Sequence, residues 1–188
     1  MFSAEGLPHF NLLEMNPLPK NIRVGIYLSS SQQISLYFRL KRLLHLSDFP
    51  HQMELYLVRD RFNDALFLEQ PFLGDKVINQ SDEEYKKINL WLVLGHPGHH
   101  PHLFKIFSNG AHIVTPTSSY ILELKEHMDE IISTYTRGDI RAALIKMKEK
   151  SSSGEYRKYM MNMNIEDEEL KRVFVGYERS LRRRLAFR

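Results

Sequence analysis

Residues 88–116 read INLWLVLGHPGHHPHLFKIFSNGAHIVTP, and this stretch decides the fold. It holds two apolar runs, 88–94 and 111–115, each as short as a buried parallel strand. Glycines and prolines break the chain after the first run, and apolar residues at 103–107 then indicate a short helix. Gly110 ends that helix, because glycine tolerates the left-handed backbone conformation. The stretch therefore predicts a strand, a loop, a helix and a second strand, with the loop at an edge where open α/β sheets bind ligands.

The same alternation continues on both sides of this stretch. Apolar runs bounded by turn residues predict further strands upstream and a short final strand downstream. The predicted strands are 22–28, 53–58, 76–79, 88–94, 111–115 and a short one within 128–135. Segments with helical spacing separate them, at 32–46, within 62–74, and at 82–87, 120–126 and 140–150. This order predicts an α/β fold, a single Rossmann-like domain whose mostly parallel sheet carries helices on both faces.

Three segments are expected along the chain. Residues 1–20 form an N-terminal arm, because their glycine and prolines prevent a long helix. Residues 21–150 form the Rossmann-like α/β domain. Residues 151–188 form a C-terminal helical extension that begins with a serine-rich joint and contains helices at 156–163 and 166–185.

The C-terminal extension carries an apolar stripe and a cluster of arginines. Val173, Tyr177, Leu181 and Leu185 recur every four residues, so this stripe is expected to pack on the body of the protein or on a partner. Five arginines lie within 179–188, where they can complement the helix dipole or contact phosphate. Nucleic acid is the less favoured partner, because aromatic residues for base stacking are almost absent there.

Composition excludes several classes of protein. The 188 residues include no cysteine, which rules out a disulfide framework, zinc–thiolate sites and a cysteine nucleophile. No apolar run is long enough to span a membrane, and the N-terminus lacks the pattern of a secretory signal. A cytoplasmic protein is expected, since the lack of cysteine fits a reducing compartment. The net charge of +3 is too small to indicate nucleic-acid binding.

The segment FKIFSNGAHIVT, residues 104–115, has the layout of a helix that ends in a small residue shortly before glycine, followed by a short apolar strand. Upstream, SDEEYKKI at 81–88 is similar to a short helix with an acidic start. Together they resemble the C-terminal, nucleotide-sugar-binding half of GT-B-type glycosyltransferases (glycosyl transferase group 1-like), over roughly residues 20 to 180. The resemblance implies a nucleotide-diphosphate sugar as ligand, no cofactor, and a companion subunit or N-terminal half that supplies the acceptor site.

Candidate binding residues follow the carboxyl ends of the predicted strands. Serines that open a helix lie beside backbone N–H groups that can bind phosphate, although serines at such positions are also common helix caps. Lys105 and Arg59 are the nearest candidate cations for a diphosphate. No catalytic residue and no metal ligand is assigned. The candidate substrate-binding residues are Ser30, Ser31, Arg59, Gly98, His99, His100, Lys105, Thr115, Ser118 and Ser119.

Four histidines, His96, His99, His100 and His102, lie in one loop. A metal site would need a further ligand and an ordered second shell, and the prolines of the loop limit how it can wrap an ion. The loop is therefore expected to be a surface loop, or a substrate loop in which a neutral imidazole acts as a base or donor near pH 7.

One departure from the resembled family bears on activity. Many of its members carry two glutamates, and the matching positions here are Pro97 and Lys105. A carboxylate can accept two hydrogen bonds from a ribose, whereas a lysine can accept none. Two functions therefore stay open. One is the donor-binding half of a glycosyltransferase, and the other is a non-catalytic interaction or assembly module of the same fold.

Overall fold

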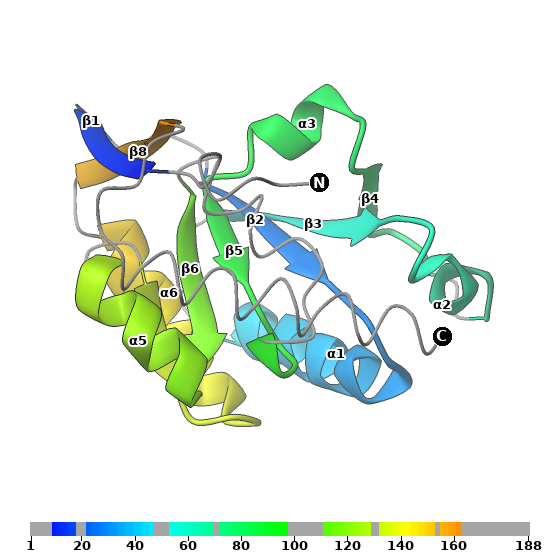
Figure 1. Ribbon diagram of the computed structural model, residues 1–188. Helices are drawn as coiled ribbons and strands as arrows, with labels where there is room; N and C mark the ends of the chain where they lie inside the picture. The colour runs from blue at the N-terminus through cyan, green and yellow to red at the C-terminus, as the bar shows by residue number, and fades with distance from the viewer. Residues whose placement is uncertain are drawn as a thin grey trace.

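A six-stranded, all-parallel sheet forms the centre of the computed structural model, with strand order β4-β3-β2-β5-β6-β7 (Figure 1). The structure describes residues 9–17, 22–46, 53–69, 72–97, 111–128, 132–152 and 155–162. The strands are β2 (Ile22–Tyr27), β3 (Met53–Arg59), β4 (Lys76–Asn79), β5 (Leu90–Leu92), β6 (His112–Pro116) and β7 (Ile132–Tyr135). Val24 lies opposite Leu55 on one side and Leu90 on the other, so β2 is a central strand. The prediction of a Rossmann-like α/β domain is confirmed.

Between β2 and β5, and again after β6, helices lie at the predicted places, whereas the helix predicted at 103–107 lies outside the described residues. The described helices are α1 (Ser31–Leu46), α2 (Asp64–Glu69), α3 (Glu83–Lys86), α5 (Ser119–Met128) and α6 (Ile140–Ser152). The chain runs outward from β2 through β3 to β4, crosses back to β5 beside β2, and then runs outward through β6 to β7. Because parallel crossovers are right-handed, the crossovers on the two sides of β2 place their helices on opposite faces of the sheet. Helix α6 contacts α1, so these two helices share one face.

The core on the α1 and α6 face follows from the alternation of side chains along the strands. Val24 and Ile26 of β2 and Leu92 of β5 are fully buried there. Leu40 of α1 and Met147 of α6 cover them and are also fully buried. Each side chain of this size contributes roughly 1.5–3 kcal/mol when it leaves water, so this layer is a main source of stability.

The opposite face is built around a glycine. A Cβ at Gly25 would lie 2.9 Å from Cδ1 of Ile88 and 3.0 Å from Cδ2 of Trp91. Trp91 in turn packs edge-on against Tyr85 of α3, with ring centroids 5.5 Å apart. Glycine at position 25 therefore allows the short α3 segment and β5 to close over the middle of β2.

Two segments far apart in the chain, one on each side of the six-stranded sheet's sequence, form a second sheet that the sequence did not predict. Strand β1 (His9–Pro17) pairs antiparallel with β8 (Glu155–Asn162), with His9 opposite Asn162. Nine residues of the predicted arm are therefore strand, and the prediction of a helix at 156–163 is wrong. The extended conformation of β8 is stabilised by ladder hydrogen bonds to a strand from the other end of the chain, and local spacing carries no information about that partner. The helix predicted at 166–185, with its apolar stripe and arginines, lies outside the described residues.

In the described part of the chain, no helix combines the length and the apolar character needed to cross a membrane.

Candidate functional site

The carboxyl edge of the sheet contains a topological switch point between β2 and β5. Counted from β2, the strands follow the doubly wound order 3-2-1-4-5-6, and the connections diverge between strands 1 and 4. In Figure 1 the arrowheads of β2, β5 and β6 point to the lower part of the view, where α1 begins. A crevice outside this point is the usual ligand site of open α/β sheets.

Gln33 of α1 joins the two loops at the switch point. Its Oε1 accepts a hydrogen bond from the Ser29 backbone N–H at 2.7 Å, and its Nε2 donates to Ser29 Oγ at 2.9 Å. The side chain is 9% exposed and lies against Gly95, where a Cβ would come within 1.8 Å of Nε2. A buried glutamine bonded in this way holds the loop after β2 in one conformation.

The predicted residues Ser30 and Ser31 lie at the start of α1, on the carboxyl side of β2 at the switch point. The Gln33 N–H donates to the Ser30 carbonyl at 3.1 Å, which begins the helix. Among the described residues, neither serine hydroxyl makes a hydrogen bond, so neither side chain caps the helix. The first turn of α1 thus has the positive end of the helix dipole and serine hydroxyls at the switch point.

The loop after β3 is held by a buried asparagine. Asn63 is 1% exposed, and its Nδ2 donates to the carbonyls of Leu28 at 3.0 Å and Val58 at 2.9 Å. Its Oδ1 accepts from the Asp60 N–H at 2.8 Å, while Asp60 Oδ1 accepts from Tyr27 Oη at 3.1 Å. These bonds tie the carboxyl end of β2 to that of β3 and give the loop a fixed shape.

A hollow of about 570 Å³ lies at the carboxyl ends of β3 and β4. Within it, Arg59 forms an ion pair with Asp64 through its guanidinium. The guanidinium of Arg61 lies 4.6 Å from the centre of the Phe62 ring, which is 38% exposed, and no carboxylate of the described residues pairs with it. The lining residues are Arg59, Asp60, Arg61, Phe62, Asp64, Asn79, Gln80 and Ser81.

The loop after β6 is bonded mostly within the fold. Thr115 is fully buried, and Ser118 Oγ accepts the Ile121 N–H at 3.2 Å, which makes Ser118 the cap of α5. Ser119 is the exposed first residue of that helix. Tyr135 Oη donates to the Val93 carbonyl at 2.6 Å, and burial raises the pKa of this phenol. The structure therefore brings Ser118 and Ser119 to the same edge as Ser30 and Ser31, but leaves Thr115 inside.

Four predicted site residues, Gly98, His99, His100 and Lys105, lie outside the described residues. Within the described ranges, no group of three or more histidine or acidic side chains could hold a metal ion. Sequence reasoning missed Gln33 and Asn63 as the residues that shape the site. The spacing of Asp60 and Asn63 after a strand is typical of a turn closed by side-chain hydrogen bonds. This spacing could have identified Asn63 from the sequence.

No family model and no curated protein sequence matches this chain. Among solved structures, it is similar to one described as the crystal structure analysis of the glycotransferase of kitacinnamycin, with 15% identity and a TM-score of 0.42. The match covers 89% of this chain and 40% of that one, so this chain spans less than half of the length of that protein. At this degree of likeness, no activity is transferred from that protein to this chain.

Proposed function

We propose that the carboxyl edge of the sheet binds a nucleoside diphosphate, and that the chain is the donor-binding half of a glycosyltransferase-like enzyme using a nucleotide-diphosphate sugar. The observation that carries the proposal is the hollow of about 570 Å³ at the carboxyl ends of β3 and β4, on the edge of the 3-2-1-4-5-6 sheet that also carries the switch point between β2 and β5. This volume is within the range of small-molecule sites, and the switch point is where such sheets bind nucleotides. The resemblance of residues 81–88 and 104–115 to the donor half of GT-B-type enzymes supports the same ligand.

In this proposal the diphosphate lies at the start of α1. The backbone N–H groups of its first turn and the helix dipole favour negative charge there. The same groups would stabilise the charge that develops on a leaving diphosphate during transfer of the sugar. The acceptor and the residue that activates it would come from a companion subunit or an N-terminal half.

The nucleoside then extends into the hollow after β3 and β4. The exposed ring of Phe62 can stack against a base, and Arg61 is a cation without a carboxylate partner among the described residues. Asn79 and Ser81 add polar groups to the lining of the hollow. An aromatic face with a few polar groups around it is the usual composition of a small-molecule site.

A second function, a non-catalytic interaction module, is favoured by one observation in the loop after β5. Pro97, which stands where the resembled family carries a carboxylate, is buried. A proline side chain has no acceptor for a ribose hydroxyl, so the donor would be held less tightly than in that family.

Isothermal titration calorimetry with UDP, GDP and their sugar conjugates tests the proposal. We expect binding that Arg61→Ala weakens by about tenfold, because a hydrogen bond to a charged group is lost. Arg141→Ala is the matched control, since Arg141 is an exposed arginine of α6 that pairs with no side chain in the described part of the chain. Release of UDP or GDP from a sugar conjugate, in the presence of the companion half, would support transfer. No binding at millimolar concentration would reject the proposal in favour of the interaction module.

A further inference from the structure

The amide of Gln33 has only one orientation that satisfies its neighbours. The backbone N–H of Ser29 can only donate, so the atom 2.7 Å from it must be the carbonyl oxygen Oε1. The amide nitrogen Nε2 is then the atom 2.9 Å from Ser29 Oγ, and it has only hydrogens to offer. Ser29 Oγ therefore acts as the acceptor of that bond.

This orientation determines what the Ser29 hydroxyl can do. Because Oγ accepts from Gln33, the proton of the hydroxyl must point to a different acceptor. In the described part of the chain, no carbonyl or carboxylate receives that proton. Ser29 is half-buried at the carboxyl end of β2, so its O–H is an oriented donor at the switch point.

Gly95 keeps the amide in this orientation. Gln33 is 9% exposed, and a Cβ at position 95 would lie 1.8 Å from its Nε2 and 2.8 Å from its Cδ. No side chain can therefore replace the glycine unless Gln33 moves. The loop after β5 thus helps to orient a hydroxyl on the loop after β2. These two loops follow the neighbouring strands between which the connections of the sheet diverge.

We propose that Ser29 is an oxyanion-binding residue and that Gln33, supported by Gly95, is its positioning residue. The acceptor that fits is a group that only accepts hydrogen bonds, such as a phosphate oxygen of a diphosphate. The inference deepens the proposed function and rests on it, since it names the side chain that holds the phosphates. It concerns a different serine from Ser30 and Ser31, whose hydroxyls have no such orienting partner in the described residues.

Three probes test this, namely inorganic pyrophosphate, UDP and uridine, titrated into the wild-type chain and into Ser29→Ala. We expect Ser29→Ala to weaken both pyrophosphate and UDP by about tenfold and to leave uridine unchanged. Ser35→Ala, an exposed serine of the same helix, is the matched control and should bind all three probes as the wild type does.

The role of Gln33 is tested by a double-mutant cycle. Gln33→Met keeps the shape of the side chain but cannot orient the hydroxyl, so it should weaken UDP nearly as much as Ser29→Ala. Combining the two should add little, because both act on one bond. Gln32→Met, at an exposed neighbouring position, is the control. Gly95→Ala should weaken UDP binding as much as Gln33→Met does, because the new Cβ would displace the Gln33 amide. It therefore tests the same role by a second route if Gln33→Met lowers the melting temperature.

The outcomes separate this inference from the proposed function. If UDP binds and Ser29→Ala binds it equally well, the oxyanion role of Ser29 is rejected while the proposed function stands. If pyrophosphate binds in a Ser29-dependent way but UDP binds no better than pyrophosphate, the role of Ser29 is supported and the nucleoside site is rejected. If the wild type binds neither pyrophosphate nor UDP, both are rejected.

Discussion

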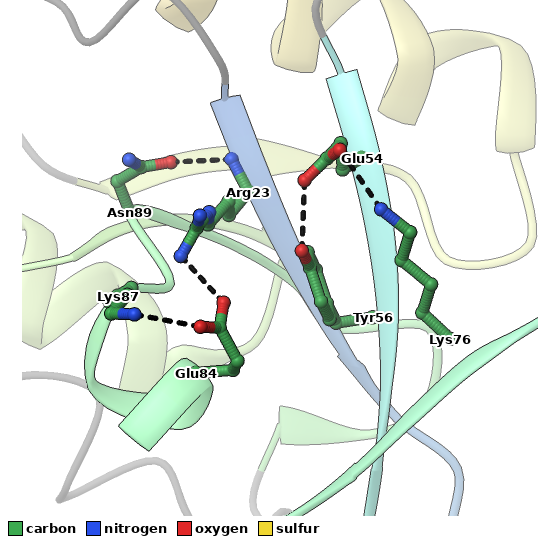
Figure 2. Close-up of polar contacts among 7 residues, drawn as sticks. All are labelled: Arg23, Glu54, Tyr56, Lys76, Glu84, Lys87 and Asn89. Carbon is green, nitrogen blue, oxygen red and sulfur yellow. Dashed lines mark hydrogen bonds and ion pairs between the residues drawn. The ribbon is translucent and has the colours of Figure 1, made fainter. Parts of the chain in front are cut away.

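The amino and carboxyl edges of the sheet carry similar side chains but use them differently. At the amino ends of the strands, Arg23 Nη1 lies 2.6 Å from Glu84 Oε2, and Lys87 Nζ lies 2.7 Å from the other oxygen of the same carboxylate (Figure 2). Glu54 is bonded in the same way on both oxygens, by Lys76 at 2.9 Å and by the Tyr56 hydroxyl at 2.8 Å. The charged groups of this cluster therefore pair with one another.

The carboxyl edge leaves donors without acceptors. Arg61 stacks on an aromatic ring instead of pairing with an acid in the described residues, and the Ser29 hydroxyl has an unused proton. Polar groups that a fold needs for itself are usually satisfied within it, so donors left over at a ligand-binding edge indicate function. The amino-edge cluster is accordingly interpreted as structural, and the carboxyl edge is the proposed site.

The largest loss of stability is expected from removing Asn63, which holds the loop after β3 at the carboxyl edge. Asn63→Ala removes three hydrogen bonds from a residue that is 1% exposed and leaves buried backbone groups without partners. We expect the free energy of unfolding to fall by about 2–4 kcal/mol, measured by urea denaturation. Asn79→Ala is the control, because this exposed asparagine also lines the hollow and should change stability little. Equal stability of the two variants would contradict a structural role for Asn63.

A smaller loss of stability is expected from Gly25→Ala, in the layer beneath the amino-edge cluster. The new Cβ would lie 2.9 Å from Ile88 Cδ1 and 3.0 Å from Trp91 Cδ2, and one of them must move. Overpacking of this kind costs about 1–3 kcal/mol, which thermal denaturation would detect. Adding Ile88→Val removes the Cδ1 atom and should recover part of the loss. If Ile88→Val restores none of the lost stability, the Cδ1 atom of Ile88 is not what clashes with the new Cβ.

Acid should weaken the amino edge through Glu54. Hydrogen bonds from Lys76 and from Tyr56 hold the pKa of this carboxyl below its usual range. A carboxyl with a depressed pKa in the folded state stabilises the protein above its unfolded pKa of about 4.3, and this contribution is lost as the pH falls through the folded value. Unfolding measured in urea between about pH 6 and pH 3 should therefore show a shallower decline for Glu54→Gln than for the wild type. The control is Glu123→Gln, which changes an exposed carboxyl of α5, and a decline equally altered by both variants would contradict the prediction.

The smallest effect is expected for an ion pair on the surface of α3. Lys86 and Glu83 are three residues apart, and their side chains are 68% and 75% exposed. Exposed pairs of this type contribute little because water and salt screen them. Lys86→Ala should leave both the melting temperature and the affinity for UDP unchanged. A clear loss of either would show that this helix is coupled to the site, which would remove the contrast between the two edges.

Strand and helix positions could be predicted because their signals are local. Strand β4 lies at the predicted residues, and β2 ends one residue before the prediction. Strand β5 is shorter than the apolar run 88–94, since Asn89 bonds through its side chain to the Arg23 N–H at 2.7 Å and Ile88 packs over Gly25. The apolar run 88–94 therefore predicted the burial of its apolar residues correctly, but the strand itself is shorter than the run.

The candidate site was only partly predictable. A serine-rich turn after a strand indicates a ligand edge, and Ser30 and Ser31 do lie there. The pairing of Ser29 with Gln33 could not be recognised, because its meaning depends on Gly95, which lies in the loop after β5 on the other side of the switch point. Arg59, predicted as a candidate cation for a diphosphate, forms an ion pair with Asp64, which the sequence did not predict.

The amino-acid sequence by itself determined the alternation of strands and helices, the burial of the central strands and the absence of thiol chemistry, because these depend on residue type and on spacing within a few residues. Only the tertiary structure decided the strand order, the pairing of β1 with β8 and the meeting of Gln33 with Gly95. Each of these joins segments far apart in the chain, and such contacts are selected by packing and hydrogen bonding over the whole fold. The proposed binding edge depends on contacts of the second kind, which is why the sequence could predict serines at the carboxyl ends of the strands but not the hydrogen bonds that orient them.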